Sequence, residues 1–261
     1  MDFITYLFAF LAPGAFVYVD LIAAATNALN GAILSQRPDH YKKNYITVMG
    51  VLVMAVFGGI GGGITRDVLL NTTPGSLTNP WYLILIIIAW LVGLKIAFGK
   101  GQKFRETFFQ LLTSFSLPWY AIVGVEKGLE AEWPLLGAIF LGIIGPTTGR
   151  FLIDVAAKVP AKHLVQGEWF IGTAALTSIC FFLLRAGAYG APFSLALGFV
   201  PATLLAFLIG FTFRVAAIWF GWEEPMPNVP AWLLKGQPRR DTLKEKMQPG
   251  WEPEWLEPEN D

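Results

Sequence analysis

The chain has 261 residues, no net charge at pH 7, 54% hydrophobic residues and only 15% charged residues. Average soluble domains carry about 25% charged residues, so this composition indicates an integral membrane protein. Zero net charge argues against a general nucleic-acid binder. The single cysteine, Cys180, rules out an intramolecular disulfide. His40 and His163 have no cluster of metal ligands beside them, so we expect no metal, no cofactor and no enzyme activity.

Apolar segments long enough to span a bilayer, about 20 residues each, follow one another along the chain. We predict an all-α membrane protein with seven transmembrane helices, at 16–35, 46–70, 81–98, 108–126, 134–157, 168–186 and 192–219. Residues 1–15 form an N-terminal apolar segment that is too short to span. Residues 221–261 form a tail rich in proline and tryptophan, which we expect in the cytoplasm.

The charges of the connecting segments predict the orientation. Segments 36–45, 99–107, 158–167 and 221–261 hold thirteen lysines and arginines, whereas the alternate segments hold only Lys127. Cytoplasmic loops are enriched in basic residues. We therefore expect the N-terminus outside and the C-terminus in the cytoplasm.

A glycine-rich segment lies inside the second apolar span and is followed at once by an arginine and an aspartate. It comprises Gly58, Gly59, Gly61, Gly62 and Gly63, with Arg66 and Asp67 after it. In a membrane, irregular backbone is tolerated only beside protein or a water-filled cavity, and ionisable residues at such depth mark ion or solute pathways. Close packing of small residues between helices is the alternative.

Two halves of the membrane part resemble each other. When Gly61-Gly62-Gly63 is aligned with Thr147-Thr148-Gly149, Pro74 and Pro160 follow at the same separation. Each half, 16–98 and 108–186, holds three spans, so the halves have opposite orientations, and residues 192–220 add a seventh helix. Inverted repeats with interrupted helices are typical of transport proteins. We expect kinks in the second helix at its glycines and in the fifth at Gly145, Pro146, Thr147, Thr148 and Gly149.

The motifs of the first half resemble the bacterial trimeric intracellular cation (TRIC) channel family, which overlaps bacterial membrane proteins whose domain is named for glycine transport. They are Val19-Asp20-Leu21, Asn30-Gly31-Ala32, Gly61 to Leu69 and Pro80-Trp81-Tyr82. Gly124 to Lys127 and Val159-Pro160 resemble its second repeat. The resemblance implies a homotrimer in which each protomer has its own pore between the kinked second and fifth helices. The implied activity is passive permeation of monovalent cations, chiefly potassium.

The second half departs from the family pattern, which repeats a glycine triplet followed by Arg-Asp. In the alignment above, Leu152 and Ile153 stand where Arg-Asp is expected. Arg150 and Asp154 occur instead, four residues apart, so they share a helix face and can pair.

Several ionisable residues in the spans have two interpretations each. Asp20 either faces cations at a pore mouth or pairs with Arg66 or Arg150, and Arg66 with Asp67 either lines the pore or ties helix ends together. Glu126 and Lys127 are most simply a solvated pair. On the inner face, anionic lipid headgroups are possible partners of basic residues, namely Lys42, Lys43, Lys100, Lys103 and Arg105.

Three functions are therefore compatible with the sequence. The first is a cation channel in the lipid bilayer. The second is a transporter of a small zwitterion such as glycine, whose carboxylate suits the N-terminus of a broken helix. The third is a non-conducting membrane subunit with the same fold.

Overall fold

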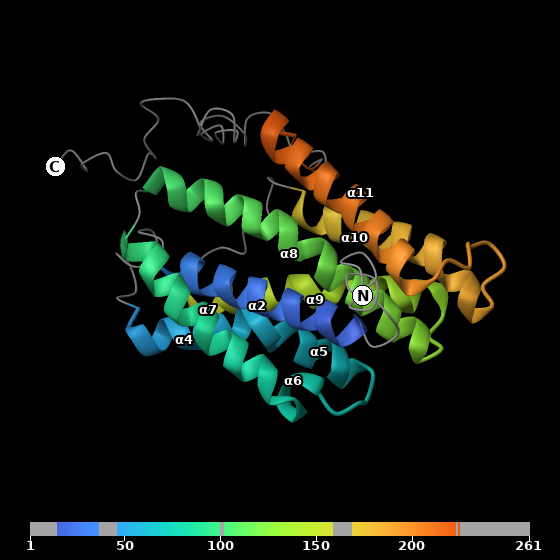
Figure 1. The fold of residues 1–261 in the computed structure, drawn as a ribbon, viewed down its shortest axis with the longest axis horizontal. Coiled ribbons are helices and arrows are strands. Elements are labelled where there is room, and N and C mark those ends of the chain that lie inside the picture. The colour runs from blue at the N-terminus through green and yellow to red at the C-terminus, as the bar shows by residue number, and fades with distance from the viewer. Residues whose placement is uncertain (1–14, 37–45, 100–101, 159–168, 223, 225–261) are drawn as a thin grey trace, which may run out of the picture.

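The structure is a computed structural model, and its described part covers residues 15–36, 46–99, 102–158, 169–222 and 224. The regular structure of this part is helical. The first half comprises α2 (Ala15–Ser35), α4 (Val48–Val56), η1 (Phe57–Gly61), α5 (Gly62–Leu69), α6 (Gly75–Thr78) and α7 (Pro80–Gly99). The second half comprises α8 (Gln102–Glu130), α9 (Leu135–Ala156), α10 (Phe170–Arg185), η2 (Ala186–Tyr189) and α11 (Phe199–Phe220). Figure 1 shows them as one bundle, with α11 at its edge.

Within the described residues, six helical segments are long and apolar enough to cross a membrane, which makes the chain a membrane protein. They are Phe16–Ser35, Val48–Leu69, Thr107–Glu130, Leu135–Ala156, Phe170–Tyr189 and Phe199–Phe220. A further apolar helix, Pro80–Ile96, is shorter over the residues whose side chains are described. It coincides with the expected third span, so a seventh crossing stays a prediction.

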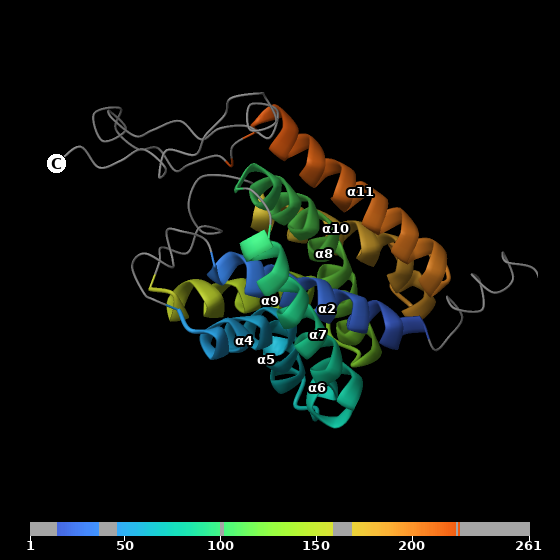
Figure 2. The same ribbon diagram turned by 60° about the vertical axis from the view of Figure 1, so that its left-hand side comes forward.

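The three helices of each half pack against one another, and the first helix contacts both the middle and the last. An alanine stripe on α2, formed by Ala24, Ala28 and Ala32, belongs to a buried cluster with Val51 of α4 and Ile86 of α7. Small residues at this spacing share one helix face and allow neighbouring helices to approach closely. In the second half, α8 contacts α9, α10 and α11, while α2 and α8 join the two halves (Figure 2).

The two middle helices cross at their glycines. A Cβ added at Gly62 would overlap the carbonyl oxygen of Gly145, and one added at Gly149 would lie 3.3 Å from the carbonyl oxygen of Gly58. Larger residues would force these helices apart. The two expected glycine segments therefore meet in the middle of the bundle.

The backbone in the two crossing segments differs. In the first half, Phe57–Gly61 form a π-helical turn between α4 and α5. In the second half, α9 is α-helical from Leu135 to Ala156, although Pro146 inside it has no N–H to donate to the ladder. Backbone irregularity occurs at the expected place in the second helix, and the kink in the fifth helix stays a prediction.

Equivalent residues of the two middle helices are 87 positions apart. The helices begin at Val48 and Leu135 and end at Leu69 and Ala156. Asn71 and Lys158 follow these ends, both in the left-handed conformation with φ of 54° and 53°. The reciprocal contacts obey the same shift, because Gly58 corresponds to Gly145 and Gly62 to Gly149.

This register corrects the sequence alignment, which matched Gly61 with Thr147 and was wrong by one residue. In the corrected register Asp154 is the counterpart of Asp67, so the second half retains the acid. Arg66 corresponds to Ile153, and Arg150 corresponds to Gly63. The spacing from glycine to proline misled the alignment because it compares loop positions beyond the helix ends.

Candidate functional site

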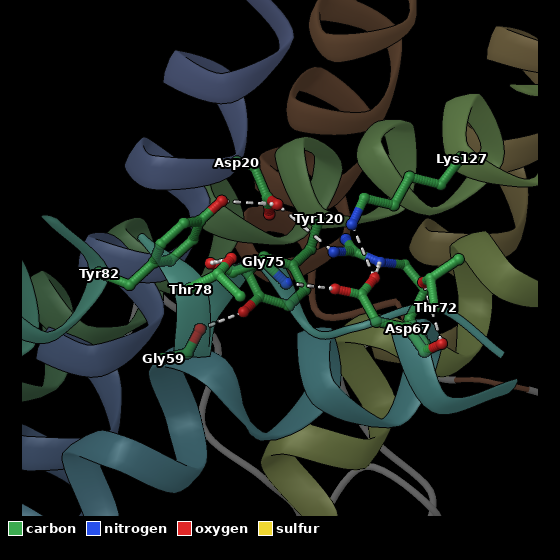
Figure 3. Close-up of polar contacts among 10 residues, drawn as sticks. Asp20, Gly59, Asp67, Thr72, Gly75, Thr78, Tyr82, Tyr120 and Lys127 are labelled. Carbon is green, nitrogen blue, oxygen red and sulfur yellow. Dashed lines mark hydrogen bonds and ion pairs between the residues drawn. The ribbon is translucent and has the colours of Figure 1, made fainter. Parts of the chain in front are cut away.

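A buried charge cluster lies at the end of the bundle where α5 terminates; we call it the Asp67 network. The Arg66 side chain, 2% exposed, donates from Nε to Asp67 Oδ1 at 2.9 Å and from Nη2 to Asp20 Oδ2 at 3.3 Å. Asp20 thus pairs with Arg66, as one of the two interpretations of the sequence holds. Figure 3 shows both carboxylates directed toward this guanidinium.

Three further donors complete the Asp67 network. The Tyr82 hydroxyl donates to Asp20 Oδ2 at 2.9 Å. Lys127 Nζ lies 2.7 Å from Asp67 Oδ1, and the backbone N–H of Gly75 donates to Asp67 Oδ2 at 3.1 Å. The network therefore holds α2, α5, α7 and α8 together and fixes the connection after α5 (Figure 3).

The interpretation of Glu126 and Lys127 as a solvated pair was wrong. Glu126 is 3% exposed and accepts from Arg185 Nη2 at 3.0 Å and from the Tyr189 hydroxyl at 3.0 Å. Lys127 reaches the other half of the molecule to bind Asp67. Both residues lie within α8, which extends to Glu130, and not in the connection that follows this helix.

Tyr120 of α8 occupies the crossing of the middle helices. It is 2% exposed, and its hydroxyl donates to the carbonyl oxygen of Gly59 in the π-helical turn. Its ring lies 3.3 Å from a Cβ built at Gly62 and 3.5 Å from one built at Gly145. The ring therefore fills the space that the glycines leave between the helices.

On the other side of Tyr120 from the Asp67 network, the structure contains a cavity of about 20 Å³ with polar and apolar walls, room for about one water molecule. We call it the Arg150 cavity. Its lining comprises Asn27, Asn30, Leu34, Gly58, Thr113, Tyr120, Gly145, Pro146, Arg150, Ile153 and Phe170. Helices α2, η1, α8, α9 and α10, from both halves, thus contribute to its walls.

Amides and hydroxyls from α2 and α8 form the polar wall of the Arg150 cavity. Asn30 Nδ2 donates to Ser116 Oγ at 3.0 Å, and Ser116 Oγ donates to Asn27 Oδ1 at 3.2 Å. Asn30 is 7% exposed, and its buried Oδ1 has no hydrogen-bond partner among the described residues. A buried carbonyl oxygen without a donor is costly, which suits a cavity that holds a water or an ion.

Arg150 and Asp154 form the expected i, i+4 pair on α9. Arg150 Nε lies 3.2 Å and 3.3 Å from the two carboxylate oxygens of Asp154. The guanidinium also lies over the ring of Phe109, 5.5 Å from its centroid. Asp154 has no exposed side-chain surface, whereas Arg150 lines the cavity.

The remaining candidate residues are distributed around the crossing. Gly145 and Pro146 line the cavity together with Gly58, and Gly59 accepts the Tyr120 bond. Thr147 donates its hydroxyl to the carbonyl oxygen of Ile143 at 2.7 Å, as a helix-packing residue does, and Thr148 is half-buried. Neither threonine is among the cavity-lining residues.

Some of the residues predicted to bind lipid, and most of the C-terminal tail, lie outside the described part of the chain. Lys42, Lys43 and Lys100 are not described, and the side chains of Lys103 and Arg105 in the first turns of α8 are not described either. The C-terminal tail is described only to Trp222 and at Glu224. In the described residues, no group of three or more His, Cys, Asp or Glu side chains could hold a metal ion.

Comparison with known proteins identifies the family. The family model described as "Glycine transporter" matches residues 17–97 and 110–186, which are more than half of the chain. The chain belongs to this family. The two matched segments correspond to the two three-helix halves of the structure.

Curated relatives are membrane proteins. The chain is 22% identical to the UPF0126 inner membrane protein YadS of Escherichia coli over 81% of this chain and 94% of that protein. It is 27% identical to a UPF0126 membrane protein of Deinococcus radiodurans over 60% of this chain and 70% of that protein.

Solved structures share the fold. A chain from a study of conductance through TRIC cation channels superposes with a TM-score of 0.66 at 23% identity, covering 82% of this chain and 98% of that one. The TRIC orthologue from Rhodobacter sphaeroides gives 0.66 at 22% identity, covering 79% and 98%. The resemblance to this family stated from the sequence is thus confirmed at the level of the fold.

Proposed function

We propose that the protein is a monovalent cation channel of the potassium type, with a pathway through each protomer between the second and fifth helices. The observation that carries this proposal is the crossing of two glycine segments from opposite halves, with a cavity lined in part by amides on one side and a network containing two carboxylates on the other. Helices packed only for stability do not require buried amides and charges at this depth.

A cation that leaves water needs oxygen atoms in place of its hydration shell. On one side of the crossing, Asn27, Asn30 and Thr113 supply amide and hydroxyl oxygens to the Arg150 cavity. On the other side, Asp20 and Asp67 supply carboxylates that the structure holds in ion pairs. The Tyr120 ring lies at the crossing of the middle helices, and in the proposed channel it would close the pathway.

The assembly and orientation belong to the same proposal. We expect a homotrimer with seven crossings per protomer, α7 being the third, in a bacterial inner membrane. The N-terminus lies outside and the tail in the cytoplasm, as the distribution of basic residues indicates. Anionic lipid headgroups bind the basic residues of the cytoplasmic side, Lys42, Lys43, Lys100, Lys103 and Arg105.

Two observations favour other functions, and the test includes both. The description of the matching family model names glycine, so a carrier of this small zwitterion is the second candidate. The small volume of the cavity and the Tyr120 ring at the crossing are what a non-conducting subunit with this fold would show.

Flux through purified protein in liposomes distinguishes the three candidates. Potassium efflux down a gradient and uptake of radiolabelled glycine are measured in parallel, with protein-free liposomes as the control. A channel passes potassium and gives no saturable glycine uptake. Saturable glycine uptake without potassium flux supports the carrier, and neither activity supports the non-conducting subunit.

Neutral variants of the acids test the pathway itself. Asp20→Asn, Asp67→Asn and Asp154→Asn each keep the side-chain shape and remove a negative charge beside the crossing. Each is expected to lower potassium flux per assembled oligomer. Unchanged flux in all three would contradict a pathway at this place.

A further inference from the structure

We infer that Arg150 is a fixed positive barrier at one end of the cation pathway, and that it makes conduction unequal in the two directions. This inference rests on the proposed channel function. It assigns a selectivity role to a residue that replaces a glycine of the other half.

Arg150 and its counterpart in the other half differ in their side chains. In the register of the two middle helices Arg150 corresponds to Gly63, because their helix ends lie 87 positions apart. A Cβ built at Gly63 would lie 3.8 Å from Nη2 of Arg66 and 3.9 Å from the Tyr120 hydroxyl, so the Arg66 guanidinium lies beside that position. In the second half the arginine itself occupies the equivalent position, and its side chain is directed to the cavity rather than to the Asp67 network.

The ion pair of Arg150 and Asp154 has a definite orientation relative to the cavity. The Arg150 side chain lines the cavity and is 14% exposed, whereas the Asp154 side chain has no exposed surface and is not part of the lining. Nε of Arg150 faces the carboxylate at 3.2 Å. The pair is thus a dipole with its positive end toward the cavity, and a cation there meets the guanidinium first.

The charges of the other described residues around the cavity decide how strongly Arg150 acts on an ion there. Among the described residues that line the cavity, Arg150 is the only ionisable side chain apart from Tyr120, and the polar ones besides it are neutral amides and a hydroxyl. In a low-dielectric setting, a fixed charge at van der Waals distance dominates the energy of a passing ion. The neutral wall supplies oxygens but no compensating negative charge.

At the opposite end the charges are arranged differently. Asp67 accepts from both Arg66 and Lys127, and Lys127 is the more exposed of these two cations at 20% of its side chain. The side chain of a lysine has a flexible stem and moves readily, whereas Arg150 is held between Asp154 and the ring of Phe109. Different barriers at the two ends predict rectification.

The test compares Arg150→Gln with Arg150→Lys in liposomes and planar bilayers. Removing the charge is expected to raise potassium flux about tenfold and to reduce rectification. It is also expected to shift the reversal potential in a KCl gradient toward that of potassium. Arg150→Lys retains the charge and is expected to stay within about twofold of the wild type, because the Coulomb interaction depends on charge rather than on side-chain shape.

Because Arg150→Gln removes the ion pair between Arg150 and Asp154, two further variants guard against misfolding. In the double variant Arg150→Gln, Asp154→Asn, flux is expected to exceed that of the wild type but not that of Arg150→Gln alone. In a Cys180→Ala background, Arg150→Cys is expected to conduct well until aminoethyl methanethiosulfonate restores a positive charge, whereas a neutral methyl reagent leaves flux high.

The outcomes separate this inference from the proposed function. Wild-type flux above that of protein-free liposomes supports the channel. If the wild type conducts and the assembled Arg150→Gln, double and Arg150→Cys proteins match it in flux and reversal potential, the barrier is refuted and the channel remains. If neither the wild type nor any variant passes potassium, the proposed function fails and the inference falls with it.

Discussion

Asp67 and Asp154 occupy equivalent positions of the two middle helices, two residues before the helix end in each case. Each accepts from the Nε of an arginine, at 2.9 Å from Arg66 and at 3.2 Å from Arg150. Arg66 is the sequence neighbour of its acid, whereas Arg150 lies one turn earlier. The two halves therefore keep the same acid–arginine pair but direct the guanidinium to different places.

We predict that Arg66→Ala severely reduces the yield of folded protein. Arg66 is 2% exposed and touches two buried carboxylates, so its removal leaves Asp20 with only the Tyr82 hydroxyl among the contacts described above. Breaking a buried ion pair by removing one partner costs about 3–5 kcal/mol. Gel filtration and thermal unfolding in detergent measure this.

Lys43→Ala provides the matched control, because it removes a positive charge from a connecting segment outside the spans. Its yield and unfolding temperature are expected to equal those of the wild type. An Arg66→Ala protein as stable as this control would show that the Asp67 network does not hold the helices together.

The glycine crossing gives a second prediction. Gly62→Ala places a methyl group against the carbonyl oxygen of Gly145, so the helices must separate or distort. Overpacking of this kind typically costs about 1–3 kcal/mol. We expect a lower unfolding temperature in detergent, while Gly75→Ala, with no atom within 4 Å of the added Cβ, leaves it unchanged. Equal effects of both substitutions would argue against a tight crossing.

A third prediction is that Arg185 helps to hold the last helices against α8. Arg185 binds Glu126 of α8 and donates from Nη1 to the carbonyl oxygen of Leu197, just before α11 begins. A double-mutant cycle of Glu126→Gln and Arg185→Gln should give a coupling free energy of about 0.5–3 kcal/mol, as contacting residues do. Additive effects on unfolding would show that the pair is not coupled.

How far the sequence predicted the molecule depends on the type of signal. Long apolar runs predicted the helices within a few residues, because twenty apolar residues have few alternatives to a spanning or buried helix. The last helix begins at Phe199 rather than at the expected residue 192. The reason is that backbone groups of Leu195 and Leu197 bond to the carbonyl oxygens of Leu183 and Leu184 instead of starting a new helix.

The site was predicted less completely. Local motifs identified Arg66, Asp67, Arg150 and Asp154, because charges inside apolar spans are conspicuous. The partners Tyr82, Tyr120 and Lys127 were missed as site residues, since each joins its partner across about 60 residues of sequence. Only the register of packed helices brings such residues together, and hydropathy does not determine it.

The position of the pathway is tested most directly by blocking it. Asn27 lines the Arg150 cavity, whereas Val53 on α4 is 48% exposed and is not part of the lining. In a Cys180→Ala background, Asn27→Cys and Val53→Cys proteins are reacted with a bulky cationic methanethiosulfonate, and potassium flux is measured before and after. Complete modification should abolish flux through Asn27→Cys and leave Val53→Cys unchanged. Full modification of Asn27→Cys with undiminished flux would contradict a pathway between the second and fifth helices.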